Sequence, residues 1–233
     1  MDFVLDFETL GTGDDCVVLS LAVTPFERDE LKTFQEYIDD TIYYKFDVES
    51  QVETGRKIDQ KTLEWWDKQD VDVKNAQVKP TNDDITLRQF LVEFYNMCKE
   101  LNIGNKSVGW ARGKEFDFGI LCHIIKTQKY VLNKDEYPIN EIYFPVPFWQ
   151  RRDIRDYIAG LVVDPNITKI PLPAETLNGF EHHNPVHDCA RAVLHIKYGE
   201  LYARGEMDIP DDVDPNSNSH EVKTSKRFTE DAG

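Results

Sequence analysis

The sequence predicts an α/β fold, in which a mixed five-stranded sheet is flanked by helices. Three β-prone segments within the first 46 residues favour an antiparallel meander at the start of this sheet. Beyond residue 58, amphipathic helical patterns alternate with two short strand-like segments. The chain has 233 residues, of which 40% are hydrophobic and 12% aromatic, so it can bury the core of one ordinary α/β domain or of two small ones.

The first predicted strand begins at Phe3 and ends in two acids, before glycines turn the chain at positions 11 and 13. Residues two apart on a strand point to the same face, so Asp6 and Glu8 project together. Like charges this close repel each other, and a divalent cation bound through carboxylate oxygens would relieve the repulsion. A lone Asp-x-Glu is nevertheless more often a solvated strand end, so only partners elsewhere in the chain can support a metal site.

The second and third strands are predicted directly after this turn. Residues 16–23 (CVVLSLAV) are β-branched and apolar, which is typical of a core strand paired with the first one. Residues 34–46 (FQEYIDDTIYYKF) alternate loosely between apolar and polar side chains and predict a third strand with an irregular beginning. The three consecutive strands would form the antiparallel meander.

A short helix is predicted over residues 59–69, with Asp59 or Thr62 as its N-cap. The helix carries two adjacent tryptophans, Trp65 and Trp66. Adjacent helical residues point about 100° apart, so one ring can enter the core while the other stays exposed. Both rings could instead pack on the sheet, whereas an exposed ring could stack on a nucleobase.

The middle of the chain predicts a loop, a helix, a strand and another helix. Polar residues 71–83 predict the loop, and apolar residues at helical spacing predict an amphipathic helix over 84–101. A strand follows at 107–111. The next helix extends to about Thr127 and has Asp117 in its first turn, where the helix dipole alone would favour an acid.

The remaining elements complete the sheet and its helices. Residues 128–147 predict a loop, and residues 148–152 a fifth strand. Asp153 is expected to cap a helix that extends to about Val163. A second loop is predicted over 165–177, followed by a final helix over 186–202.

The chain becomes polar and acidic after Gly205, which predicts a folded domain over residues 1–205 and a mobile tail over 206–233. The chain contains no apolar segment long enough to span a bilayer and begins with no secretory signal, so no membrane partner is expected. Its four cysteines show no metal-binding or redox spacing and indicate a reduced, cytoplasmic protein.

The formal net charge is −16, which predicts weak non-specific affinity for nucleic acid. It does not exclude an enzyme that neutralises phosphate locally with metal ions. The charge is also compatible with a protein of another class, a non-catalytic acidic binder that mimics DNA. Metal binding would separate these two possibilities.

Three short motifs follow one another along the chain: Asp6-Phe7-Glu8-Thr9-Leu10-Gly11, Phe116-Asp117, and His183-Asn184-Pro185-Val186-His187-Asp188. In this order and spacing, over roughly residues 3–203, the chain resembles the proofreading-type (DnaQ-like, DEDDh) 3′→5′ exonucleases, which have an RNase H-like fold. Two further segments are similar to a phage-type branch of that family: Thr62-Leu63-Glu64-Trp65-Trp66 and Arg152-Asp153-Ile154-Arg155. A phage-encoded chain would work in the host cytoplasm. Many relatives have an Asn shortly before the second-motif Asp, where this chain has Arg112-Gly113-Lys114-Glu115.

The resemblance implies a two-metal phosphodiesterase with a histidine as general base. The four acids Asp6, Glu8, Asp117 and Asp188 would hold two Mg²⁺ or Mn²⁺ ions. Among three nearby histidines, His183 is the expected base because it lies five residues before Asp188, as in the family. His182 is the weaker alternative, and His187 should point elsewhere.

The implied substrate is the 3′ end of single-stranded DNA, hydrolysed to nucleoside 5′-monophosphates; RNA is the alternative, and tolerance of the 2′-hydroxyl would decide. By resemblance, the backbone of Thr9 would meet the terminal ribose and Leu10 would wedge against the last base. Phe116 would line the pocket, and Trp65 or Trp66 would stack on a base. The sequence predicts no oligomeric state.

Overall fold

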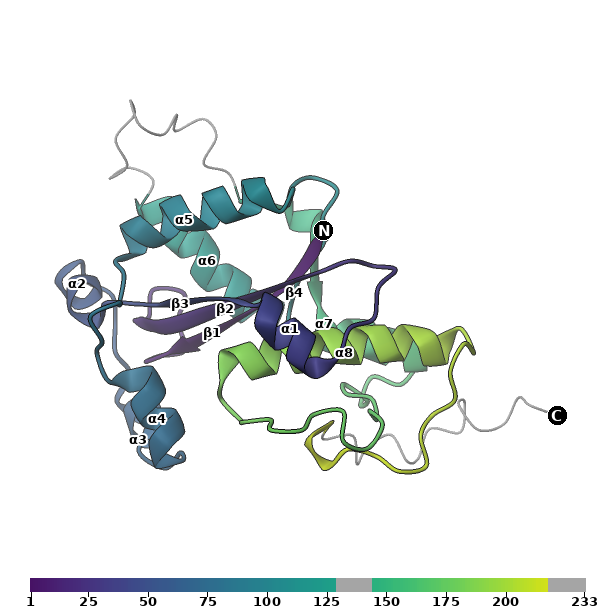
Figure 1. Ribbon diagram of the computed structural model, residues 1–233. Coiled ribbons are helices and arrows are strands. Elements are labelled where there is room, and N and C mark those ends of the chain that lie inside the picture. Colours follow the sequence, from purple (N-terminus) through teal and green to yellow (C-terminus); the bar gives the residue numbers. More distant parts are fainter. Residues whose placement is uncertain (129–143, 218–233) are drawn as a thin grey trace.

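A computed structural model describes residues 1–128 and 144–217 of the chain. Five strands form one sheet in the order β3-β2-β1-β4-β5 (Figure 1). The strands are β1 (Asp2–Thr9), β2 (Val18–Phe26), β3 (Ile42–Lys45), β4 (Gly109–Ala111) and β5 (Arg151–Asp153). β1, β2 and β3 pair antiparallel, whereas β4 joins β1 in parallel and β5 joins β4 in parallel. This is the predicted mixed five-stranded sheet, with its initial antiparallel meander.

Helices cover both faces of the sheet and enclose a separate core on each side. On one face lie α5 (Leu87–Glu100) and α6 (Lys114–Gln128), and on the other lie α1 (Phe34–Asp40), α7 (Ile154–Val162) and α8 (Pro185–Ala203) (Figure 1). Alternation along β1 supplies both cores, because Phe3, Leu5 and Phe7 face α5 and α6 while Val4 faces α8.

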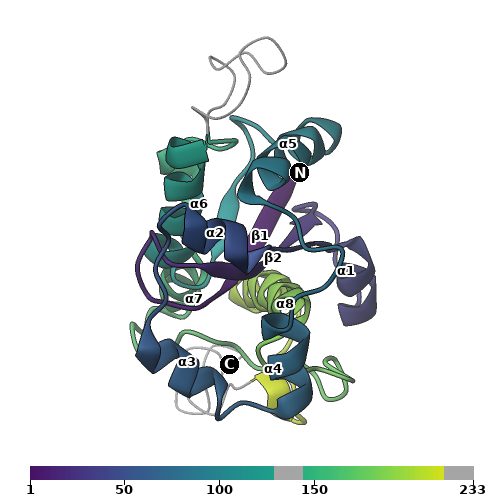
Figure 2. The ribbon, with the colours of Figure 1, turned by 90° about the vertical axis from the view of Figure 1, so that its left-hand side faces the viewer.

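Two short helices stand beyond the end of the sheet. α3 (Gln60–Trp66) and α4 (Val71–Val78) lie close to the beginning of α8 in both ribbon views (Figures 1 and 2). They pack on a third, smaller cluster that contains Leu10, Val17, Leu19 and Trp66. They thus form a wall beside the carboxyl end of β1.

The predicted third strand is wrong in its first half. Residues 34–40 form α1, and only Ile42–Lys45 pair with β2. Thr33 and Glu36 form a capping box, in which each side chain satisfies the backbone N–H of the other residue. Phe34 and Tyr37 are buried one helical turn apart, so the loose alternation was in fact a helical pattern.

The loop predicted over residues 71–83 is also wrong, because α4 occupies 71–78. Asp70 caps this helix by accepting hydrogen bonds from the N–H groups of Asp72 and Val73. The helix has hardly any apolar face; it docks partly through the buried Gln77, whose Oε1 accepts a hydrogen bond from Ser20 at 2.5 Å. A second helix, α2 (Val48–Glu53), was not predicted.

Other elements follow the predictions with shifted boundaries. α5 begins at Leu87 after a Thr86 capping box, three residues later than expected. The predicted fifth strand is a 3-10 turn over Phe148–Gln150 followed by β5, and Asp153 caps α7 as predicted. Most of the predicted loop over 128–147 lies outside the described residues.

The segment after α8 returns to the body of the protein. The buried Asp214 accepts a hydrogen bond from the N–H of Leu177 at 2.8 Å, and its own N–H donates to the carbonyl of Leu172. This part of the predicted tail is therefore packed, whereas residues 218–233 lie outside the described part. Within the described ranges, no helix has the length and hydropathy needed to cross a membrane.

Candidate active site

The centre of the site is the second half of β1, which extends past its neighbour β4. The two strands pair only at Phe3 and Val4, so the N–H of Phe7 on this side has no strand partner. Asp117 takes that place, because its Oδ1 accepts a hydrogen bond from the Phe7 N–H at 3.0 Å. The first turn of α6 is thereby fixed against β1, between the two acids of the Asp-x-Glu motif.

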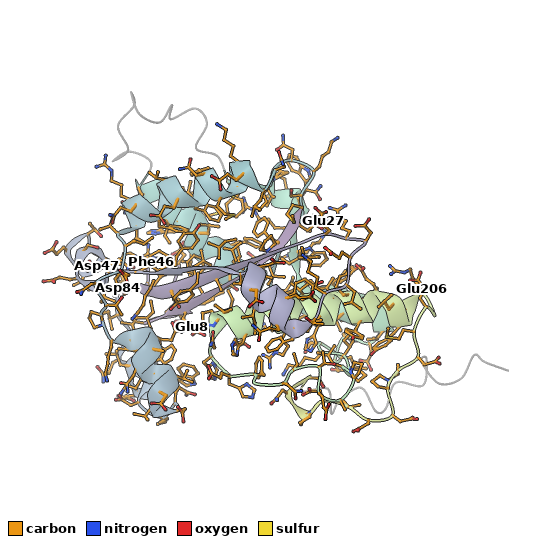
Figure 3. The ribbon with its side chains drawn as sticks, viewed as in Figure 1. Glu8, Glu27, Phe46, Asp47, Asp84 and Glu206 are labelled. Atoms are coloured by element: carbon orange, nitrogen blue, oxygen red, sulfur yellow. The ribbon has the colours of Figure 1, made fainter. Side chains whose placement is uncertain are left out.

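Asp188 reaches the same place from the other face of the sheet. Asn184 caps α8 and Pro185 occupies its first turn, which brings Asp188 into the turn closest to β1. One oxygen each from Asp6, Glu8 and Asp188 lie within 4.8 Å of one another. Figure 3 shows Glu8 beside the first turn of α8. The structure therefore brings Asp6, Glu8 and Asp188 together from β1 and α8. Asp117, at the beginning of α6, lies outside this group of three, but it accepts the Phe7 N–H between Asp6 and Glu8 and its charge acts on Asp6.

Burial and mutual repulsion disfavour the ionised form of this cluster. Burial raises the pKa of Asp6 well above its ordinary value, and the three neighbouring carboxylates raise it further. The pKa of Glu8 is likewise raised by burial and then by the charges of Asp188 and Asp117. Burial raises the pKa of Asp117 to about 7, although the hydrogen bond from Phe7 opposes this.

These observations fit a divalent cation site. Closely spaced carboxylates supply the hard oxygen ligands that Mg²⁺, Mn²⁺ and Ca²⁺ take in proteins. A bound cation would stabilise the ionised forms that burial and repulsion now disfavour. The donor set contains neither thiolate nor imidazole, so it matches a hard cation better than a structural zinc.

The sequence analysis missed Arg191, which forms an ion pair with Asp188 Oδ1 one helical turn away. Its guanidinium also lies over the ring of Phe180, 4.2 Å from the centroid. The i, i+3 spacing of Asp188 and Arg191 on a helix was the available signal. Arg191 leaves Asp188 Oδ2 to accept a hydrogen bond from the backbone N–H of His183 at 3.1 Å.

His183 lines the same pocket as the acids, as predicted for the general base. Its backbone adopts the left-handed region, with φ of 61°, a conformation that non-glycine residues seldom adopt outside special sites. Trp65 contacts the imidazole edge-on at 4.7 Å between ring centroids and limits its orientation. His182 also lines the pocket, whereas His187 points elsewhere, since its Nδ1 accepts a hydrogen bond from the Glu181 N–H.

The two tryptophans separate as the helical geometry allowed. Trp66 is 1% exposed and donates its indole N–H to the carbonyl of Thr9 at 2.9 Å, so it cannot stack on a base. Trp65 is 39% exposed and faces the pocket. The structure thus corrects the prediction for Trp66 and leaves Trp65 as the candidate.

The other predicted substrate contacts are less accessible than expected. Leu10 is buried in the cluster beneath α3, so in this conformation its side chain cannot wedge against a base. Thr9, whose backbone was predicted to meet the terminal ribose, is buried, and its carbonyl already accepts the indole N–H of Trp66. Phe116 packs partly against the core below α6 and does not line the pocket.

The acids open into a pocket of about 340 Å³. Besides Asp6, Glu8, Asp188 and the two histidines, side chains from three helices and from the turn after β4 line it: Trp65, Arg155, Arg191 and Arg112. Arg112 and Arg155 belong to the segments Arg112–Glu115 and Arg152–Arg155, to which the sequence assigned no function. The pocket therefore combines acids for a cation with arginines that suit a phosphate.

The chain is similar to a family of known activity and to several characterised nucleases. The family model of the 3′-5′ exoribonuclease Rv2179c-like domain matches residues 1–198. The exodeoxyribonuclease of Enterobacteria phage T4 is 36% identical over 222 residues, which cover 93% of this chain and 97% of that protein. The nuclease domain of 3′hExo, a DEDDh family member bound to rAMP, has a TM-score of 0.49 at 14% identity and covers 88% of this chain and 93% of its own. The E. coli ExoI–ssDNA complex has a TM-score of 0.49 at 13% identity and covers 88% of this chain and 40% of its own.

The family match spans most of the chain, and the T4 relative aligns over nearly its whole length. Exonucleases of this group generally use divalent metal ions, which agrees with the carboxylate cluster. The chain therefore belongs to the Rv2179c-like 3′-5′ exonuclease family and is a hydrolytic exonuclease.

Proposed function

We propose that this exonuclease removes nucleotides from the 3′ end of single-stranded DNA and releases nucleoside 5′-monophosphates, with two Mg²⁺ or Mn²⁺ ions as cofactors. The observation that carries the proposal is the convergence of Asp6, Glu8 and Asp188 beside His183, with Asp117 next to them through the hydrogen bond it accepts from the Phe7 N–H. Asp6, Glu8, Asp117 and Asp188 would hold the ions. When bound, such ions promote ionisation of an attacking water and stabilise charge on phosphoryl oxygens.

The chain's own residues then orient the reactants and move the proton. His183 accepts the proton of the attacking water at a ring nitrogen, and the edge of Trp65 keeps that ring facing the pocket. Arg191 holds the carboxylate of Asp188 in place. The exposed part of Trp65 offers a surface on which the terminal base stacks, which favours an unpaired 3′ end.

DNA is the proposed substrate because the T4 relative, which aligns over nearly the whole chain, is described as an exodeoxyribonuclease. The family model carries the description exoribonuclease, which favours RNA as the second candidate. Competition between matched DNA and RNA oligonucleotides in one reaction measures the preference directly. If RNA is hydrolysed faster than DNA, the proposed substrate is wrong, whereas the proposed reaction is unaffected.

The direct test is hydrolysis of a 5′-labelled single-stranded oligonucleotide with Mg²⁺ or Mn²⁺, analysed on a denaturing gel. We expect a ladder that shortens from the 3′ end, nucleoside 5′-monophosphate as product, and no reaction in EDTA. Asp188→Asn should remove activity while the circular dichroism spectrum is preserved. Internal fragments, shortening from the 5′ end, or an intact substrate under all metal conditions would contradict the proposal.

A further inference from the structure

Two segments singled out in the sequence, Arg112–Glu115 and Arg152–Arg155, meet at one carboxylate. Asp153 Oδ2 accepts a hydrogen bond from the N–H of Lys114 at 2.9 Å, and Asp153 Oδ1 accepts one from the N–H of Arg155 at 2.9 Å. Because β4 and β5 are parallel, α6 and α7 begin side by side at the same edge of the sheet. Asp153 therefore fixes the beginning of α7 against the turn that leads to Asp117.

This junction places Arg155 over Gly113. A Cβ built at Gly113 would lie 3.5 Å from Arg155 Nη1, and the φ of +109° at Gly113 is strained for any other residue. Because Gly113 has no side chain, the guanidinium of Arg155 can lie across this turn. Arg155 is exposed and lines the pocket that contains Asp6, Glu8 and Asp188.

Arg155 differs from the two other arginines of the pocket. Arg112 donates to the carbonyl of Thr168 at 2.9 Å and contacts His195 Nδ1 at 2.8 Å, and Arg191 is paired with Asp188. Within residues 1–128 and 144–217, no hydrogen bond or ion pair engages the Arg155 guanidinium.

An exposed guanidinium at the edge of an acidic pocket suits a phosphodiester substrate. The protein has a net charge of −16, so the approaching backbone meets overall repulsion and needs local cations. Arginine presents several donors in a planar fork that matches phosphate oxygens. We propose that Arg155 binds a phosphate of the substrate strand at the side of the pocket formed by the Gly113 turn and the beginning of α7. This inference rests on the proposed function.

The test compares Arg155→Gln with Arg152→Gln, which removes the same charge three residues earlier. Arg152 lines a different cavity with Tyr157 and Glu200, so it serves as the matched control. Affinity for fluorescein-labelled single-stranded DNA is measured by anisotropy in Ca²⁺ at several salt concentrations. Arg155→Gln should weaken binding about tenfold and make the dependence on salt shallower by roughly one phosphate contact, whereas Arg152→Gln should match wild type. Arg155→Lys should recover part of the affinity.

Turnover measured on two substrates shows which phosphate of the substrate strand Arg155 contacts. The p-nitrophenyl ester of thymidine 5′-monophosphate contains a single phosphodiester, whereas an oligonucleotide also has the following phosphates. Loss of kcat/KM on both substrates supports contact with the reacting phosphate, and loss on the oligonucleotide alone supports contact with the next one. If Arg155→Gln and Arg152→Gln have the same affinity, salt dependence and turnover, the inference about Arg155 is wrong, and the proposed function is unaffected. A wild-type protein that neither binds nor hydrolyses nucleic acid would overturn the proposed function, and this inference with it.

Discussion

The buried, closely spaced acids Asp6 and Glu8 suit metal binding but lower the stability of the metal-free protein. Their folded-state pKa values lie above the ordinary ones because of burial and neighbouring acids. A raised folded pKa adds stability below the unfolded pKa, and that contribution is lost as the pH rises through the folded value. At neutral pH the metal-free cluster is therefore a destabilising feature that is kept for metal binding.

Asp6→Asn should raise the stability of the metal-free protein while it removes activity. Loss of one charge relieves the repulsion, and we expect the free energy of unfolding in EDTA at pH 8 to rise by about 1 kcal/mol. Exonuclease activity should fall by roughly 10³-fold, because a cation ligand is lost. Urea unfolding and the oligonucleotide assay provide the two readouts. Asp14→Asn, at an exposed acid near the same turn, should change neither; an Asp6→Asn protein less stable than wild type in EDTA would refute the explanation.

His183→Ala should lower kcat by about 10²- to 10⁴-fold, the usual contribution of a general base. Its side chain is not a proposed ligand, so Mn²⁺ affinity measured by calorimetry should stay close to the wild-type value. His182→Ala, which removes the adjacent imidazole of the same pocket, should retain most activity. Equal losses in the two variants would reject the assignment of the base to His183.

The Trp65-Trp66 pair shows how much of the site can be predicted from the residue pattern alone. Helical geometry allowed one buried and one exposed ring, and the structure has this arrangement. Which ring is buried depends on the carbonyl of Thr9, whose position relative to α3 is set by tertiary packing. The proposed ligand set was implied by the family resemblance, whereas the pairing of Arg191 with Asp188 depended on rotamers that the sequence does not specify.

At the scale of elements, α8 carries a buried polar side chain in the middle of its apolar face. His195 is 1% exposed, and its Nδ1 contacts Arg112 Nη2 at 2.8 Å. Burial lowers the pKa of His195 well below its ordinary value, and the charges of Arg112, Arg191 and Lys169 lower it further. The ring is therefore neutral in the folded protein, and it gains a proton on unfolding at mildly acidic pH.

This burial predicts a pH dependence of stability. The unfolded state binds the extra proton below about pH 6.5, so acid favours unfolding, by up to about 1.4 kcal/mol per pH unit from this group. His195→Asn keeps an acceptor for Arg112 and removes the titration. Its free energy of unfolding should be lower at pH 7.5 but should fall less steeply than that of wild type between pH 6.5 and 5. Parallel curves from urea unfolding in EDTA would contradict this account.

Elements with a strong apolar face, such as α5, were predictable from the sequence because burial requires that periodicity. α1 and α4 were not. α1 was hidden in an alternating pattern whose capping box at Thr33 and Glu36 was the decisive local signal. α4 has no periodic apolar face, and its position depends in part on the contact between Gln77 and Ser20, which are 57 residues apart.

At the scale of the molecule, cation binding should be linked to folding. The proposed ligands come from β1, α6 and α8, and the unfolded chain cannot bring them together. At a Mn²⁺ concentration of 100 times Kd, one site adds about 2.7 kcal/mol to the free energy of unfolding. Mn²⁺ should therefore raise the melting temperature of wild type, with a much smaller shift for Asp188→Asn. Equal shifts in both proteins would place the cation elsewhere.

The central claim is that four acids from distant parts of the chain share divalent cations. A crystal grown with Mn²⁺ and thymidine 5′-monophosphate, measured at the manganese absorption edge, tests it most directly. We predict two anomalous peaks within bonding distance of the carboxylate oxygens of Asp6, Glu8, Asp117 and Asp188. Anomalous peaks only at other acids, or none in crystals whose nucleotide is well defined, would contradict the claim.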